Sequence, residues 1–241
     1  MFKVGLYGYS VYNRCINILR VKSMRYQCLI LDHDDTAVDS TGYIHYPSFV
    51  QALKELRPNE PVLTLEQFVD YCFNPGFTAL CQDIEQFSQS EMQRQQAIWR
   101  QYNQALTAQF FSGFPQLVRA FKQRGGKVTV ISQSDASKIE SDYLTTCHFK
   151  PDIVYGWDAG PGKRKPATYP VKQILQRLQL APEAALVVDD LRPGLEMAAK
   201  CGVPFAAAGW APKTPRIKAW MQSHADMYFS QVDQLAAFLL A

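Results

Sequence analysis

The feature that most constrains the fold is an apolar run that ends directly in a cluster of carboxylates. Residues 26–31 read Tyr-Gln-Cys-Leu-Ile-Leu, and residues 32–36 read Asp-His-Asp-Asp-Thr. Such a run predicts a fully buried strand, and open α/β sheets bind ligands at the carboxyl ends of their strands. Clustered carboxylates repel each other, so they imply a nearby cation, most simply Mg²⁺. The alternative is an acidic loop that caps the following helix.

Strand and helix patterns alternate along much of the remaining chain. Four further segments have the apolar composition of strands, at residues 126–131, 152–155, 185–188 and 203–206. Between and around them, apolar residues recur at helical spacing over residues 114–123, 169–178 and 195–200. This alternation predicts a parallel sheet that helices cover on both faces.

The stretch between the first two predicted strands has no strand pattern. Residues 39–111 instead show helical patterns, at residues 49–56, 65–72 and 90–108. Residues 90–93, Ser-Glu-Met-Gln, fit an N-capping box for the last of these helices. An all-helical insertion directly after the carboxylate cluster favours a lid over the site, and a purely structural appendage is the alternative.

The expected fold class is therefore α/β, a Rossmann-like parallel sheet covered by helices on both faces, with an inserted all-helical cap domain. We expect residues 24–38 and 112–241 to form the core domain and residues 39–111 to form the cap.

The first 23 residues differ in charge from the rest of the chain. They contain four basic residues and no acid, whereas the remainder has 21 basic and 22 acidic residues, a net charge of −1. A targeting peptide is one interpretation. We favour a second, in which Met24 is the biological start and residues 1–23 form an extension outside the fold.

Composition excludes several functional classes. Hydrophobic residues make up 47% and charged residues 20%, as in ordinary globular enzymes, and no apolar run approaches the roughly 20 residues of a membrane span. No basic patch of the nucleic-acid-binding kind is present. The six cysteines form no CxxC pair, which is typical of a reducing compartment. We expect a cytoplasmic protein, monomer or dimer, that binds neither nucleic acid nor membrane.

The motifs occur in an order that resembles the haloacid dehalogenase superfamily of phosphohydrolases. The set comprises two acids after the first strand, a serine after the second, a Lys-Pro pair and a late acid pair, at Asp32, Asp34, Ser132, Lys165, Asp189 and Asp190. Each motif alone is a weak signal, but the ordered set is specific. The resemblance covers residues 24–241 and points to the helical-cap branch of phosphatases and β-phosphoglucomutases.

The resemblance implies a distinct role for each acid. Asp32 would be the nucleophile that forms an aspartyl-phosphate, and Asp34 the general acid and base. The implied cofactor is Mg²⁺, with Asp32, Asp34 (through its backbone carbonyl), Asp190 and Asp189 as ligands, the last directly or through water.

The resemblance also implies a phosphate-binding group. Ser132 and the adjacent Gln133 follow a strand, and Lys165 precedes a proline. For Ser132 the alternative is a helix N-cap. Lys163 and Arg164 are interpreted as solvated loop charges, either of which would replace Lys165 if the loop register differed.

Three positions depart from the family pattern. His33 replaces a bulky apolar residue; we favour a structural role, with a side chain that points into the core or toward the cap hinge. The alternative is a side chain that interacts with a substrate or modulates the neighbouring carboxylates. Asp35 replaces the more usual glycine and is interpreted as a bystander. Gly194 stands where a second downstream acid is common, and Asp189 is expected to compensate.

The predicted function is that of a Mg²⁺-dependent phosphatase of a small phosphorylated metabolite, similar to phosphoglycolate phosphatase. Dehalogenases and phosphonoacetaldehyde hydrolases lack an acid at the position of Asp34, and Lys54 is read as an ordinary surface lysine. The alternatives are a sugar phosphomutase similar to β-phosphoglucomutase and a catalytically inactive binding relative.

Substrate choice is expected to depend on the cap. Candidate contributors without a motif, each more typical of a structural role, are Thr41, His45, Tyr46, Arg57, Trp99 and Arg100.

Overall fold

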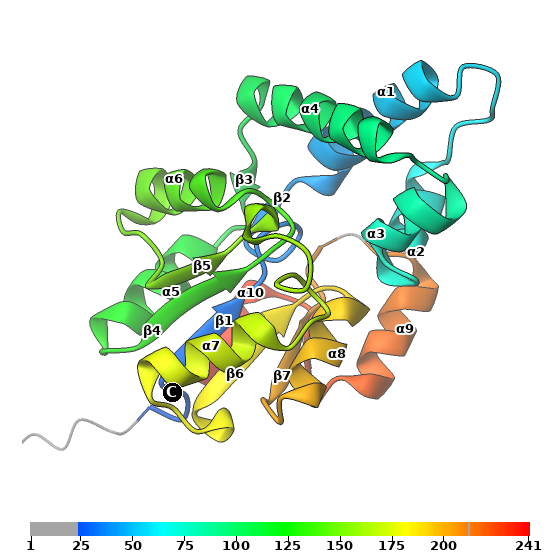
Figure 1. Ribbon diagram of the computed structural model, residues 1–241. Helices are drawn as coiled ribbons and strands as arrows, with labels where there is room; N and C mark the ends of the chain where they lie inside the picture. Colours follow the sequence, from blue (N-terminus) through cyan, green and yellow to red (C-terminus); the bar gives the residue numbers. More distant parts are fainter. Residues whose placement is uncertain (1–23, 212) are drawn as a thin grey trace, which may run out of the picture.

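The computed structural model describes residues 24–211 and 213–241. Within them, six parallel strands form one sheet in the order β5-β4-β1-β6-β7-β8 (Figure 1). The strands are β1 Cys28–Leu31, β4 Lys127–Ile131, β5 Ile153–Tyr155, β6 Ala185–Asp189, β7 Phe205–Ala208 and β8 Met227–Phe229. Every residue of β1 and β6 is buried, as expected for central strands of a parallel sheet.

Successive residues of each strand face two different hydrophobic clusters. Leu29 and Leu31 of β1 belong to one cluster, and Cys28 and Ile30 to the other, because side chains alternate between the faces of a strand. The first face packs against α5 Phe114–Gln123, α6 Ala136–Cys147 and α10 Val232–Leu240. The second packs against α7 Tyr169–Leu178, α8 Arg192–Lys200 and α9 Pro215–His224. The predicted α/β class, with helices on both faces, is confirmed.

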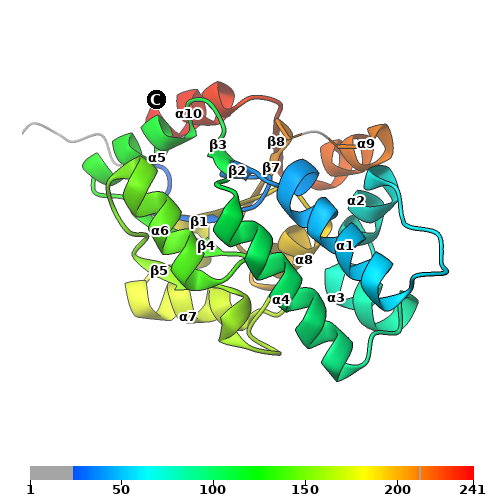
Figure 2. The same ribbon diagram turned by 90° about the horizontal axis from the view of Figure 1, so that it is seen from above.

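Between β1 and β4 the chain forms a group of helices beyond the carboxyl ends of the strands (Figures 1 and 2). It comprises a helical turn Thr41–His45, α1 Tyr46–Leu56, α2 Leu65–Phe73, α3 Phe77–Ala79, a second turn Leu80–Ile84 and α4 Gln89–Ala105. Where the chain leaves and returns, the short strands β2 Val38–Asp39 and β3 Gln109–Phe110 pair antiparallel. The expectation of no strand in residues 39–111 was therefore wrong, because two-residue strands leave no alternation to detect.

The structure also differs from the sequence-based prediction in where some elements begin and in four elements that were not predicted. Helix α4 is capped by Ser88, whose hydroxyl accepts from the Glu91 N–H while the Glu91 carboxylate accepts from the Ser88 N–H. This capping box is two residues earlier than predicted, because a carboxylate in the first turn also complements the helix dipole. Strand β7 begins at Phe205 rather than at residue 203, since Pro204 has no N–H to donate. The sequence patterns predicted no element at the positions of α6, α9, α10 and β8.

Two further expectations concern the N-terminal extension and membrane-spanning segments. The extension of residues 1–23 lies outside the described residues. No helix in the described ranges combines the length and apolarity that crossing a bilayer requires.

Candidate active site

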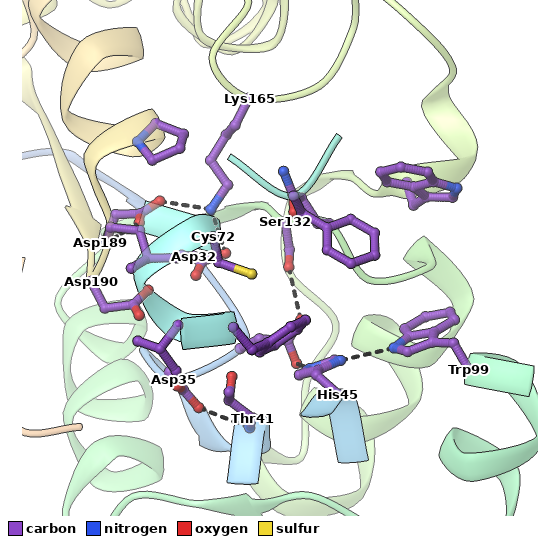
Figure 3. A pocket seen from close by; sticks show the side chains of 18 of the residues that line it. Asp32, Asp35, Thr41, His45, Cys72, Trp99, Ser132, Lys165, Asp189 and Asp190 are labelled. Atoms are coloured by element: carbon purple, nitrogen blue, oxygen red, sulfur yellow. Dashed lines mark hydrogen bonds and ion pairs between the residues drawn. The ribbon is translucent and has the colours of Figure 1, made fainter. Parts of the chain in front are cut away.

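The sheet topology brings the chemically important residues to one edge. Strand β1 lies between β4 and β6, so the residues that follow these three strands are neighbours in space. Asp32 follows β1, Ser132 follows β4, and Asp189 and Asp190 come at the end of β6. Figure 3 shows these side chains converging on one cavity, which the helices of the insertion border from the other side.

A buried lysine joins two of the carboxylates. Lys165 Nζ lies 2.6 Å from Asp32 Oδ1 and 2.7 Å from Asp189 Oδ2. Burial raises the pKa of Asp32 to about 6 although Lys165 opposes the shift, and the charges of Asp189 and Asp34 raise it further. Without a further cation, the site therefore holds more negative charge than its lysine neutralises.

The carboxylates at this edge fit a hard divalent cation. Asp32, Asp189 and Asp190 are buried, and each offers an oxygen that lies within 4.8 Å of the others. An all-oxygen donor set of this kind suits Mg²⁺. The Asp34 carboxylate is not part of this group; that its backbone carbonyl serves as a metal ligand stays a prediction.

Asp34 is held instead by a set of hydrogen-bond donors. Its Oδ2 accepts from the hydroxyls of Ser134 (2.5 Å) and Ser132 (3.3 Å), and its Oδ1 accepts from the hydroxyl of Ser40 (2.9 Å). His45 Nε2 lies 2.8 Å from the same Oδ1. Burial would raise the pKa of Asp34, but His45 and Ser134 together hold it well below the usual range.

The tautomer of His45 follows from its second partner. The Trp99 indole N–H donates to His45 Nδ1 at 2.8 Å, and an indole nitrogen can only donate. His45 therefore carries its proton on Nε2, the nitrogen that faces Asp34. His45 ends the helical turn before α1 and Trp99 lies on α4, so the insertion contacts the acid directly.

All the predicted catalytic, phosphate-binding and metal-binding residues line one cavity of about 130 Å³. They are Asp32, Asp34, Ser132, Gln133, Lys165, Asp189 and Asp190. Three of the candidate specificity residues, Thr41, His45 and Trp99, also line it.

The sequence model of the haloacid dehalogenase-like hydrolases matches residues 29–208. The chain belongs to this family. It is similar to the phosphoglycolate phosphatase of Aquifex aeolicus (strain VF5), with 33% identity over 98 residues, which are 40% of this chain and 45% of that protein. The match thus spans less than half of that relative.

Solved structures of other proteins share the fold of this chain. A haloacid dehalogenase-like family protein from Streptococcus pneumoniae superposes with a TM-score of 0.69 at 22% identity, covering 89% of this chain and 98% of that one. CbbY from Rhodobacter sphaeroides, solved in complex with phosphate, gives 0.71 at 15% identity, covering 90% and 100%.

This haloacid dehalogenase-like hydrolase has a second buried lysine that sequence reasoning missed. Lys213 Nζ lies 2.8 Å from Asp35 Oδ2 and 2.9 Å from Asp190 Oδ2. The interpretation of Asp35 as a bystander was therefore wrong. Its Oδ1 also accepts from the Thr41 N–H at 3.1 Å, and its φ of 56° is one that Asp tolerates better than most residues. The sequence signal for this role was an acid at Asp35, where the resembling family usually has glycine.

The packing around Gly194 explains why no second downstream acid occupies this position. A Cβ at this position would lie 2.2 Å from the carboxyl group of Asp189. The space that another side chain would need is therefore filled by Asp189; that Asp189 takes over the role of the missing acid stays a prediction.

His33 has a structural environment. Its side chain is buried, with Nε2 3.2 Å from Asp142 Oδ2 and the ring near those of Phe110 and Tyr143. The favoured interpretation, a side chain that points into the core, agrees with this placement.

The remaining candidates point elsewhere. The Tyr46 hydroxyl donates to the Leu63 carbonyl, Arg57 pairs with Glu91, and Arg100 pairs with Asp135.

Basic and thiol side chains near the site agree with their expected minor roles. Lys54 and Lys163 are exposed, and the Arg164 guanidinium stacks on the Trp157 ring at 3.5 Å rather than entering the cavity. Cys72 lines the cavity, but burial raises the pKa of its thiol to about 12, so it is no thiolate nucleophile near neutral pH.

The raised acid pKa values predict an unusual pH dependence for the metal-free protein. Burial raises the pKa of Asp190 to about 7 and that of Asp32 to about 6. The folded state therefore binds more protons than the unfolded state between about pH 4 and 7, and stability falls as the pH rises through this window. Urea unfolding in EDTA should give a free energy about 4 kcal/mol lower at pH 8 than at pH 5. Mg²⁺ should reduce this difference; an equal or rising stability toward pH 8 in EDTA would contradict the prediction.

Proposed function

We propose that this protein is a Mg²⁺-dependent phosphatase of a small phosphate monoester, similar to phosphoglycolate phosphatase in its catalytic groups. The observation that carries the proposal is Asp32, a buried carboxylate in contact with Lys165, at the base of a cavity that Asp34 also lines. The proposal includes a core of residues 24–38 and 112–241, a cap of residues 39–111, and action on a metabolite of the cytoplasm.

In the proposed first step, an oxygen of Asp32 attacks phosphorus and the ester oxygen leaves, which forms an aspartyl-phosphate. Asp34 donates a proton to the leaving oxygen. Ser132, Gln133 and Lys165 bind the phosphate oxygens. When bound by Asp32, Asp189 and Asp190, Mg²⁺ would supply positive charge that offsets the repulsion between Asp32 and the dianionic phosphate.

In the second step, Asp34 takes a proton from water, and the resulting hydroxide attacks phosphorus and releases phosphate from Asp32. Asp34 must lose some of its present hydrogen bonds before it can donate a proton. One of these bonds comes from His45 in the insertion, so the proton transfer is coupled to the position of the proposed cap.

The proposal is tested by phosphate release and metal dependence together. We expect release from acetyl phosphate and simple esters with Mg²⁺ and loss of release in EDTA, restored by added Mg²⁺. Saturating Mg²⁺ should also raise the thermal midpoint, since a ligand at 100 times its Kd stabilises by about 2.7 kcal/mol. Asp190→Asn should lose this shift, whereas Asp233→Asn, an exposed acid on α10, should retain it.

Two outcomes would overturn the proposal. Phosphate release that is equal in EDTA and Mg²⁺ would exclude the metal-dependent mechanism. Sustained formation of glucose 6-phosphate from β-glucose 1-phosphate and a sugar bisphosphate would instead identify a phosphomutase.

A further inference from the structure

The part of the cavity that faces the insertion is largely aromatic. Its apolar lining includes side chains from the insertion and from the core, among them Phe68, Val69, Phe77, Trp99, Trp157 and Leu191. If the proposed phosphatase function holds, the phosphate lies at Asp32, and this aromatic part receives the alcohol of the ester.

The aromatic rings form a connected set that can border a flat group. Phe77 packs edge-on against Trp157, with centroids 6.2 Å apart, and against Phe68, 6.4 Å apart. Trp99 is held by its hydrogen bond to His45. Aromatic pairs favour edge-to-face and offset arrangements of this kind, so a ligand ring has several faces and edges to contact.

Within the described part of the chain, this region has no lysine or arginine free to pair with a second anionic group of a substrate. Among the described residues that line the cavity, the lysines are Lys165 and Lys213, and each lies between two carboxylates.

The arginines of the insertion, residues 39–111, are also engaged elsewhere. Arg57 pairs with Glu91, Arg94 with Glu55, and Arg100 with Asp135, and none of the three lines the cavity. A carboxylate or second phosphate on the substrate would therefore be buried against aromatic rings without a counter-ion, which is costly.

Neutral hydrogen-bonding groups are present instead. Gln95 and Gln96 on α4 and Thr41 line the cavity, and amides and hydroxyls can pair with the edge of a heteroaromatic ring. The cavity of about 130 Å³ must hold the phosphate at Asp32 as well as the alcohol, so the space that remains suits a compact group such as a single ring.

We infer that the preferred substrates are phosphate monoesters of neutral alcohols that carry one aromatic or heteroaromatic ring, and that esters with a second anionic group are disfavoured. This inference rests on the proposed phosphatase function and narrows it to a class of alcohol.

The test compares three phosphate monoesters, each with its ester oxygen on a CH₂ group, on the wild-type protein with Mg²⁺. We expect kcat/KM for benzyl phosphate to exceed that for ethyl phosphate about tenfold, and that for 2-phosphoglycolate by about 100-fold. Benzyl phosphate contains the ring, ethyl phosphate has neither ring nor second charge, and 2-phosphoglycolate adds a carboxylate. Equal values for benzyl and ethyl phosphate, or a preference for 2-phosphoglycolate, would overturn the inference.

Two variants test the proposed cause of the preference. Phe77→Leu should lower kcat/KM for benzyl phosphate severalfold more than it lowers kcat/KM for ethyl phosphate. Gln96→Arg should raise kcat/KM for 2-phosphoglycolate about tenfold, whereas Gln93→Arg, which adds the same charge at an exposed position of α4, should not. If Phe77→Leu affects both neutral esters equally, or Gln96→Arg has no more effect than Gln93→Arg, the inference is wrong.

Binding to the Asp32→Asn protein separates this inference from the proposed function. If the wild type hydrolyses none of the esters, including acetyl phosphate, the phosphatase proposal fails. Calorimetry with Asp32→Asn still decides the inference, since tighter binding of benzyl phosphate than of 2-phosphoglycolate supports it. The reverse order of affinity contradicts it.

Discussion

Replacing Asp32 with asparagine is expected to reduce phosphate release at least about 1,000-fold, because the amide cannot act as the nucleophile. The variant should remain folded. At neutral pH the Asp32 carboxylate lies among other buried acids, and its pKa is raised to about 6. Removing its charge should therefore leave the free energy of unfolding of the metal-free protein equal or higher. Steady-state phosphate release and urea unfolding of the same preparation measure both effects.

Asp83→Asn is the matched control for Asp32→Asn, because Asp83 is an exposed aspartate in the insertion. It should leave activity and stability unchanged. An Asp32→Asn protein with full activity would eliminate the aspartyl-phosphate mechanism. An Asp32→Asn protein that failed to fold would show instead that the Asp32–Lys165 ion pair stabilises the core.

Replacing Lys165 with methionine should impair both stability and catalysis. The substitution leaves Asp32 and Asp189 buried without their shared cation. Breaking a buried ion pair by removing one partner costs about 3–5 kcal/mol, so we expect a loss of this size in metal-free urea unfolding at pH 8. The loss should shrink as the pH falls, because burial raises the pKa of both carboxylates and a protonated carboxyl group needs no counter-ion. Phosphate release should fall at least about 100-fold.

Lys163→Met is the control for Lys165→Met, because Lys163 lies two residues away in the same loop and is exposed. It should change neither property measurably. If both variants behaved alike, Lys165 would have no special role, and the phosphate-binding cation would have to be sought elsewhere in the loop, as the alternative register suggested.

The site was more predictable than the packing around it. Asp32, Ser132 and Asp190 come directly after strands whose apolar runs are visible in the sequence. Parallel strands place their carboxyl ends at one edge of a sheet, so these residues were expected to meet. Strand order was the missing information. Only the structure shows that β1 lies between β4 and β6.

Lys213 illustrates what local sequence patterns cannot show. It lies 178 residues from Asp35 in the chain, yet its ammonium contacts both Asp35 and Asp190. No spacing rule connects positions so distant. The pairing follows from burial, because several carboxylates enclosed at one sheet edge require more than one cation. The same holds for the Trp99–His45–Asp34 chain of hydrogen bonds, which unites α4, the turn before α1 and the loop after β1.

The sequence by itself determined the α/β class, the helical character of the insertion and the residues that we propose for catalysis, because strand runs, helical periodicity and clustered acids are local properties. The tertiary structure decided which charges neutralise each other and which side chains line the rest of the cavity. Those properties depend on contacts between segments far apart in the chain. Here these contacts place Lys165 and Lys213 among the acids and several aromatic side chains in the same cavity.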